Sequence, residues 1–133
     1  MTNDQLSDFL TRIRNAGMSR ASKVDVMNTR MNRAVADILV REGFIKSVKE
    51  VNVETKTALR LYLKFEGGDL RKPVIQGLKR QSRPGLRRYV SSDKLPRVMS
   101  GFGTVILSTS KGVLTSKEAS AQKVGGEYLC SIW

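Results

Sequence analysis

The stretch Thr104-Val105-Ile106-Leu107-Ser108-Thr109-Ser110-Lys111-Gly112 joins an apolar segment to a run of hydroxyl side chains. The apolar half predicts a buried strand, and the polar half predicts a turn. Hydroxyl groups both donate and accept hydrogen bonds, so Ser108, Thr109 and Ser110 can meet a polar partner surface. The same hydroxyls can instead satisfy the backbone of their own turn. The stretch therefore predicts a β-rich segment that ends in either a binding loop or a self-contained turn.

The residues after this stretch predict a short helix and a closing strand. Thr115 and Glu118 have the spacing of a capping box, which predicts a helix to about Gln122. Residues 127–133 predict a strand, and its buried part would include Cys130.

Gly125, Gly126 and Glu127 open the predicted closing strand. The two glycines either form a turn or let a partner's backbone come close. Glu127 can accept a hydrogen bond from an exocyclic amine of a base, or it can orient a neighbouring side chain. These residues therefore belong to the candidate surface of Ser108–Ser110, with both interpretations open.

Before this stretch the pattern changes from helical to alternating. Apolar residues recur at helical spacing at Leu6, Phe9, Leu10 and Ile13, and again at Met31, Val35, Ile38 and Leu39. Thr29 is the predicted N-cap of the second helix, and Gly43 its end. Strands are predicted at residues 23–27, 44–53, 59–65, 73–78 and 86–90.

A break at Gly67-Gly68-Asp69 predicts two small lobes in an α/β (α+β) protein. Residues 1–66 would form an N-terminal α-β-α-β-β lobe. Residues 70–133 would form a C-terminal lobe that is mostly β with a short helix. Pro84-Gly85 predicts a turn within this second lobe.

The composition excludes most catalytic chemistry. The 133 residues contain no histidine and one cysteine, Cys130, so the commonest general base and the usual zinc clusters are absent. The sequence predicts a buried structural thiol, no metal site and no cofactor. An RNA-processing enzyme, with chemistry carried by Glu127, Glu118 or Asp93, is the remote alternative.

Charge points to a polyanionic partner. Lys and Arg number 24 against 12 acids, a net charge of +12. Between residues 71 and 97, Asp93 is the only acid, and the basic residues are Arg71, Lys72, Lys79, Arg80, Arg83, Arg87, Arg88, Lys94 and Arg97. A solvated surface usually mixes both signs, so this stretch favours nucleic acid over a simple charged face. An anionic membrane fits less well, because no helix combines a basic face with a spare apolar one.

RNA fits the pattern better than DNA. No zinc-finger spacing, basic zipper or dense basic helix face is present for a major groove. RNA helices display 2′-hydroxyl groups in a shallow minor groove, where the small donors Ser108, Thr109 and Ser110 can bind. Tyr89 can stack on an unpaired base, although half-buried strand filling is the alternative. Lys79 and Arg83 are the candidate phosphate contacts, and Arg87 and Lys111 are further candidate RNA-binding residues.

Several ordered segments resemble ribosomal protein eight of the bacterial small subunit (the S-eight family) across nearly the whole chain. They are Asp8–Ala16, Gly77–Arg80, Pro84–Tyr89, Leu95–Val98, Ile106–Gly112 and Gly125–Trp133. Gln5 departs from a proline common in the family, Ser120 from a common arginine, and residues 50–57 match poorly.

The resemblance implies a two-lobed structural protein that binds the central domain of 16S rRNA at an irregular helix and supports 30S assembly. Its C-terminal lobe would bind through Ser108–Ser110, Tyr89 and Gly125-Gly126-Glu127. Its N-terminal lobe would add auxiliary contacts from Arg12, Arg14 and Asn15. Neighbouring small-subunit proteins would be further partners, and the alternative is a repressor that binds its own operon's mRNA.

The expected location is the cytoplasm, in the ribosome. No segment approaches the ~20 apolar residues of a membrane span. The first residues, Met1-Thr2-Asn3-Asp4, lack the basic flank of a signal peptide.

Overall fold

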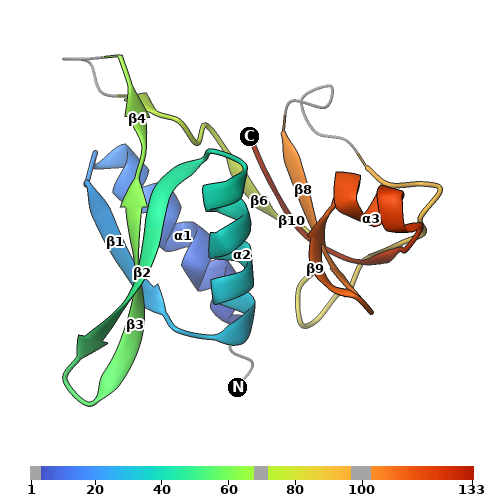
Figure 1. Cartoon of the computed structure of the whole chain (residues 1–133), viewed down its shortest axis with the longest axis horizontal. Coiled ribbons are helices and arrows are strands. Elements are labelled where there is room, and N and C mark those ends of the chain that lie inside the picture. The colour runs from blue at the N-terminus through green and yellow to red at the C-terminus, as the bar shows by residue number, and fades with distance from the viewer. Residues whose placement is uncertain (1–3, 68–71, 97–102) are drawn as a thin grey trace. The chain divides into compact units, whose positions relative to one another are not determined.

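The computed structural model describes residues 4–67, 72–96 and 103–133 (Figure 1). Its contacts divide the chain into two compact units. The N-terminal unit is Gln5–Gln76, and the C-terminal unit is Gly77–Trp133 together with Met1–Asp4. Both contain antiparallel strands, and the chain holds three helices among its described residues, so the predicted α+β class is confirmed.

The N-terminal unit packs two helices on a three-stranded antiparallel sheet. The helices are α1 (Gln5–Met18) and α2 (Arg30–Arg41), and the sheet order is β1 (Lys23–Met27), β3 (Lys56–Leu63) and β2 (Ile45–Val53). A short ladder of β4 (Phe65–Glu66) and β5 (Lys72–Pro73) follows.

The predicted helical stripes form the core of the N-terminal unit. Phe9, Leu10, Val35 and Leu39 are each no more than 2% exposed, and they are accompanied by buried leucines of β3. Thr29 caps α2 as predicted, because its side-chain oxygen accepts a hydrogen bond from Asn32 N at 3.0 Å.

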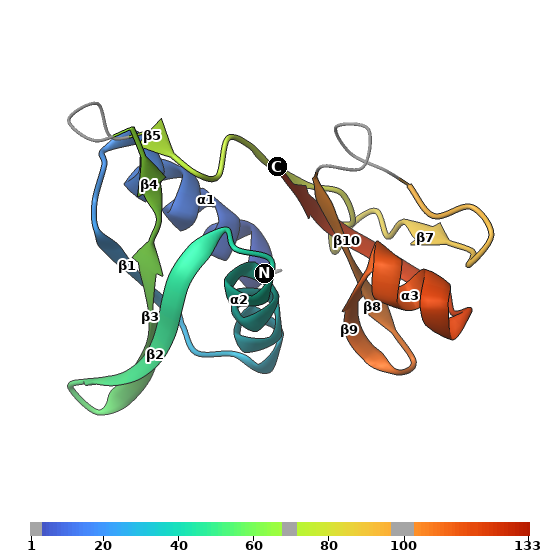
Figure 2. The ribbon, with the colours of Figure 1, turned by 45° about the horizontal axis from the view of Figure 1, so that its top comes forward.

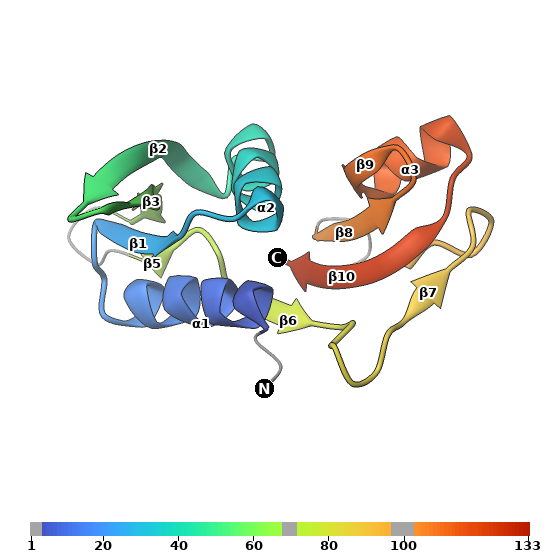
Figure 3. The ribbon, with the colours of Figure 1, turned by 90° about the horizontal axis from the view of Figure 1, so that it is seen from below.

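The C-terminal unit is built around its last strand. The sheet order is β6 (Leu78–Arg80), β10 (Gly126–Ile132), β8 (Thr104–Thr109) and β9 (Gly112–Thr115), and β7 (Tyr89–Val90) also pairs with β10. Figure 3 shows β10 between β8 and β7. Helix α3 (Ser116–Gln122) lies against β8 and β9 (Figure 2).

One face of this sheet forms the apolar core with α3. Val105, Leu107, Leu114 and Ala119 are buried together, and Val90, Leu95, Val124 and Tyr128 pack against them. Cys130 is fully buried, as predicted, and burial raises the pKa of its thiol to about 12. The thiol therefore stays protonated at neutral pH and is no nucleophile.

Two predicted strands have the wrong extent, and one strand was missed. The strand predicted at 73–78 is divided, because β5 ends at Pro73 and β6 begins at Leu78. The strand predicted at 86–90 shrinks to Tyr89–Val90, because backbone hydrogen bonds between Arg83 and Leu86 close a tight turn around Pro84-Gly85. Strand β9 was not predicted, since only Val113 and Leu114 supply an apolar signal there.

The predicted Ser108–Ser110 turn is also shorter than expected. Ser108 and Thr109 belong to β8, where Thr109 pairs with Gly112 of β9. Ser110 and Lys111 alone connect the two strands, and Gly112 has a φ of +106°, which favours glycine. The predictions for Gly68-Asp69, Arg71 and Arg97 concern positions outside the described residues.

The capping box of α3 generates a stability prediction. Glu118 N donates to Thr115 Oγ1 at 3.2 Å, and Thr115 N donates to Glu118 Oε1 at 3.1 Å. We expect Thr115→Ala to lower the free energy of unfolding by ~1 kcal/mol, because the backbone N–H of Glu118 loses its side-chain acceptor at the start of the helix. Urea unfolding followed by the fluorescence of Trp133, the single tryptophan, measures this.

The matched control is Ser120→Ala in the same helix. Ser120 is exposed, and alanine has a higher helix propensity than serine. It should leave stability unchanged or slightly raised. Equal stability of Thr115→Ala and the wild type would contradict the role of the cap.

Candidate nucleic-acid interface

Strand register brings the separate candidates into two rows. Tyr89, Glu127 and Ser108 are directly paired across β7, β10 and β8. Directly paired residues of antiparallel strands project from the same face. The next row, Val90, Gly126 and Thr109, therefore projects from the opposite face, which α3 covers. The sheet thus places an aromatic, an acid and a hydroxyl side by side on its other face.

The glycines of this site are required by the protein's own backbone. A Cβ on Gly126 would collide with Ser108 O of β8, and a Cβ on Gly125 would collide with Val90 O. Both spaces are filled by neighbouring strands of this chain. The close backbone approach expected at these glycines is therefore internal, and it keeps β7, β10 and β8 tightly spaced.

The Thr109 hydroxyl stabilises its own turn. Its Oγ1 donates to Gly112 O at 2.8 Å and accepts from Lys111 N at 3.1 Å. Ser110 and Lys111 are exposed at the tip of the same turn, while Ser108 is half-buried. The self-contained alternative thus holds for the Thr109 hydroxyl, and Ser110 and Lys111 are the accessible polar groups of the predicted loop.

Tyr89 is exposed on a basic surface. Its relative exposure is 71%, so the half-buried strand interpretation is wrong. Arg83, Arg87 and Arg88 are exposed in the segment that leads to it, and Leu86 is 62% exposed beside them. An open aromatic ring among guanidinium groups can stack on a base while the cations contact phosphates.

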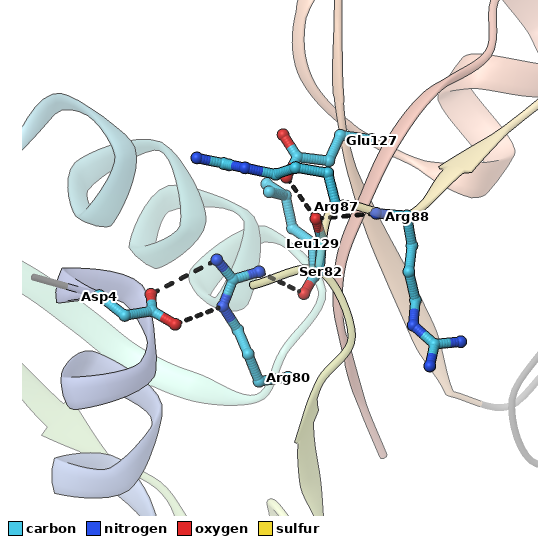
Figure 4. A network of polar contacts seen from close by, with 7 residues as sticks. All are labelled: Asp4, Arg80, Ser82, Arg87, Arg88, Glu127 and Leu129. Carbon is cyan, nitrogen blue, oxygen red and sulfur yellow. Dashed lines mark hydrogen bonds and ion pairs between the residues drawn. The ribbon is translucent and has the colours of Figure 1, made fainter. Parts of the chain in front are cut away.

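Glu127 faces inward within this basic surface (Figure 4). Its side chain is 14% exposed, and its Oε2 accepts hydrogen bonds from the Ser82 hydroxyl and from Arg87 Nη1, the latter at 2.9 Å. Burial raises the pKa of Glu127, but the hydrogen bonds from Ser82 and Arg87 outweigh it and the net pKa is lowered. Of the two predicted roles, orienting neighbours is the one that this geometry fits.

Ser82 is the residue that sequence reasoning missed. It is fully buried, and its oxygen also accepts from Arg88 N at 3.1 Å. Its only local signal is a small hydroxyl side chain between Gln81 and Arg83, which is typical of an exposed loop. Its role depends on β10, 45 positions further along the chain.

Arg80 supports β10 from the same edge as Ser82, through its position on β6. Its Nη1 donates to Leu129 O at 2.8 Å, and its Nε and Nη2 donate to Asp4 at 3.3 and 3.4 Å (Figure 4). Its side chain is 10% exposed. Arg80 is therefore a structural member of the basic stretch, in contrast to the exposed Arg83, Arg87 and Arg88.

Four of the predicted contacts do not belong to this cluster. Lys79 is exposed on β6, where it pairs with Ser131 of β10. Ser131 lies four positions along β10 from Glu127, which corresponds to about 13 Å between the two residues. Arg12, Arg14 and Asn15 lie on α1 in the N-terminal unit and are exposed. Arg12 and Asn15 share a helix face, whereas Arg14 lies about 200° around the axis from Arg12. Arg12 also pairs with Asp8 at 2.9 Å.

No described helix has the length and apolar character needed to cross a membrane. The site's accessible groups are cations, hydroxyls and one aromatic ring. Its carboxylate Glu127 is held by internal donors, so the arrangement can bind and position a polyanion.

Comparison with known proteins identifies relatives over the full chain. The family model described as "Ribosomal protein S8" matches residues 4–133. A protein of Guillardia theta named "Small ribosomal subunit protein uS8c" is 50% identical over 133 residues, which is 100% of each chain. "Small ribosomal subunit protein uS8" of Moorella thermoacetica is 51% identical, covering 98% of each chain.

The lowered pKa of Glu127 predicts a pH dependence of stability. A carboxyl group with a lower pKa in the folded state stabilises the fold above its ordinary pKa, here 4.5, and this contribution is lost as the pH falls through the folded pKa. Between about pH 6 and about pH 3, we expect the wild type to lose more free energy of unfolding than Glu127→Gln. Urea unfolding across this range measures the difference.

Above about pH 6, where Glu127 stays ionised, the difference between the two proteins should be constant. Parallel stability curves down to about pH 3 would show that the Glu127 carboxylate gains nothing from Ser82 and Arg87.

Proposed function

The chain belongs to the ribosomal protein S8 family, and from this premise we propose that its C-terminal unit binds 16S rRNA directly. Proteins of this family are structural constituents of the small ribosomal subunit, so the chain is a ribosomal protein and no enzyme. The target that we propose is an irregular helix of the central domain, and the consequence of binding is support for 30S assembly.

The exposed Tyr89 beside exposed arginines is the observation that carries the proposal. Burying an aromatic ring is normally favourable, yet this ring is 71% exposed next to Arg87 and Arg88. The exposed ring is therefore available to stack on a base of a binding partner, and the neighbouring cations favour a partner with phosphates. Ser110 and Lys111 add donors suited to 2′-hydroxyl and phosphate groups.

The N-terminal unit would supply weaker, auxiliary contacts. Arg12 and Asn15 present one polar face of α1. Arg12 forms an ion pair with Asp8, and the negative charge of Asp8 reduces the attraction of Arg12 for a phosphate. Arg14, on a different side of α1, would contact a different part of the RNA or a neighbouring small-subunit protein.

Replacing Tyr89 tests the stacking contact. We expect Tyr89→Ala to weaken binding to a 16S central-domain RNA fragment by about ten-fold, because base stacking on an aromatic contributes about 1–3 kcal/mol. Tyr89→Phe keeps the ring and should retain most of the affinity. Filter binding measures both, and urea unfolding should show little change for these exposed substitutions. Wild-type affinity of Tyr89→Ala would contradict the stacking role.

Salt dependence tests the phosphate contacts. Replacing Arg83 or Lys111 by Ala should reduce the slope of log affinity against log salt by about 1 for each lost contact, since fewer counterions are released. Lys117→Ala is the matched control, because Lys117 is exposed on α3, which covers the opposite face of the sheet. Equal slopes for all three variants would contradict this assignment.

Cosedimentation with small subunits separates the ribosomal role from a purely regulatory one. A protein that acts only on its operon's mRNA would bind that RNA but be absent from assembled subunits. A single surface would serve both targets, so either RNA should compete with the other for binding.

A further inference from the structure

A buried serine connects the last strand to the basic segment. The Ser82 hydroxyl donates to Glu127 Oε2, its oxygen accepts from Arg88 N at 3.1 Å, and Ser82 N donates to Tyr128 O at 3.0 Å. Tyr128 N in turn donates to Arg88 O at 2.8 Å. The backbone of Arg88 is therefore held on both sides, immediately before Tyr89.

Glu127 holds the neighbouring guanidinium group. Arg87 Nη1 donates to Glu127 Oε2, while the Arg87 side chain remains 49% exposed. A guanidinium has five N–H donors, so those that Glu127 does not use can bind a phosphate. Figure 4 shows the Arg87 and Arg88 side chains running in different directions from this anchor. A single carboxylate thus sets the direction of one of the two arginines.

An acid in this position opposes RNA binding by direct electrostatics. A carboxylate near a phosphate is repulsive, so removing its charge should strengthen binding if it has no other effect. Holding a long side chain in its bound geometry acts the other way, because less conformational freedom is lost on binding. These two effects have opposite signs, and a measurement can tell them apart.

We propose that Ser82 and Glu127 are positioning residues, which act as a pair to hold Arg87 and the segment before Tyr89 in the geometry that binds RNA. The inference rests on the proposed function and deepens it. Neither residue needs to touch the RNA, because both act through Arg87 and the Arg88 backbone.

The test compares two acids of the C-terminal unit. Asp93 is exposed and accepts a hydrogen bond from Ser91, whereas Glu127 is largely buried and holds Arg87. We expect Glu127→Gln to weaken binding to the 16S central-domain fragment by about ten-fold, although it removes a negative charge. Asp93→Asn should leave the affinity unchanged or slightly raised.

An affinity of Glu127→Gln equal to or above that of Asp93→Asn would overturn the proposal while leaving RNA binding intact. Failure of the wild-type chain to bind the fragment would instead overturn the proposed function. The two failures are therefore distinguishable within one titration series.

The salt slope separates positioning from a general loss of structure. Arg87→Ala should lower the slope by about 0.9 in the wild type, but hardly at all in the Glu127→Gln background, where Arg87 is already released. Ser82→Ala should also weaken binding under conditions where circular dichroism shows the variant to be folded. An equal slope change for Arg87→Ala in both backgrounds would refute the coupling.

Discussion

Pairing of β10 on both of its edges is the constraint on which the C-terminal unit depends. β8 pairs with one edge of β10 along its length. On the other edge, β7 pairs with the start of β10 and β6 pairs with its end. Gly125 and Gly126 allow this, because a Cβ at either position would strike the backbone of a neighbouring strand. Segments around residues 80, 89 and 108 therefore meet on one strand, and the candidate interface follows from that meeting.

Basic residues in this unit divide into structural and accessible groups. Arg80 is largely buried between Asp4 and the carbonyl of Leu129, so its charge supports the fold. Arg83, Arg87 and Arg88 are exposed, and their charges remain available to a polyanion. Net charge predicts attraction to nucleic acid but cannot separate these groups, since burial depends on strands distant in sequence.

Local patterns predicted the elements that rest on local physics. The helical stripes around Phe9 and Val35, the Thr29 cap and the Thr115–Glu118 capping box all involve residues within a few positions of one another. The short strands β6, β7 and β9 were missed or misplaced, because each exists mainly through pairing with another segment. A two-residue strand such as Tyr89–Val90 has no periodicity to detect.

The sequence by itself determined the helices, the α+β class, the buried thiol of Cys130 and the family, because these depend on periodicity, composition and ordered motifs. Only the tertiary structure decided what Ser108, Thr109 and Ser110 do. It placed Ser108 beside Glu127 on one face, used the Thr109 hydroxyl to close a turn, and left Ser110 exposed. It also revealed Ser82 as the partner of Glu127. The physical reason is that strand register and burial are set by contacts between distant residues, which no local pattern encodes.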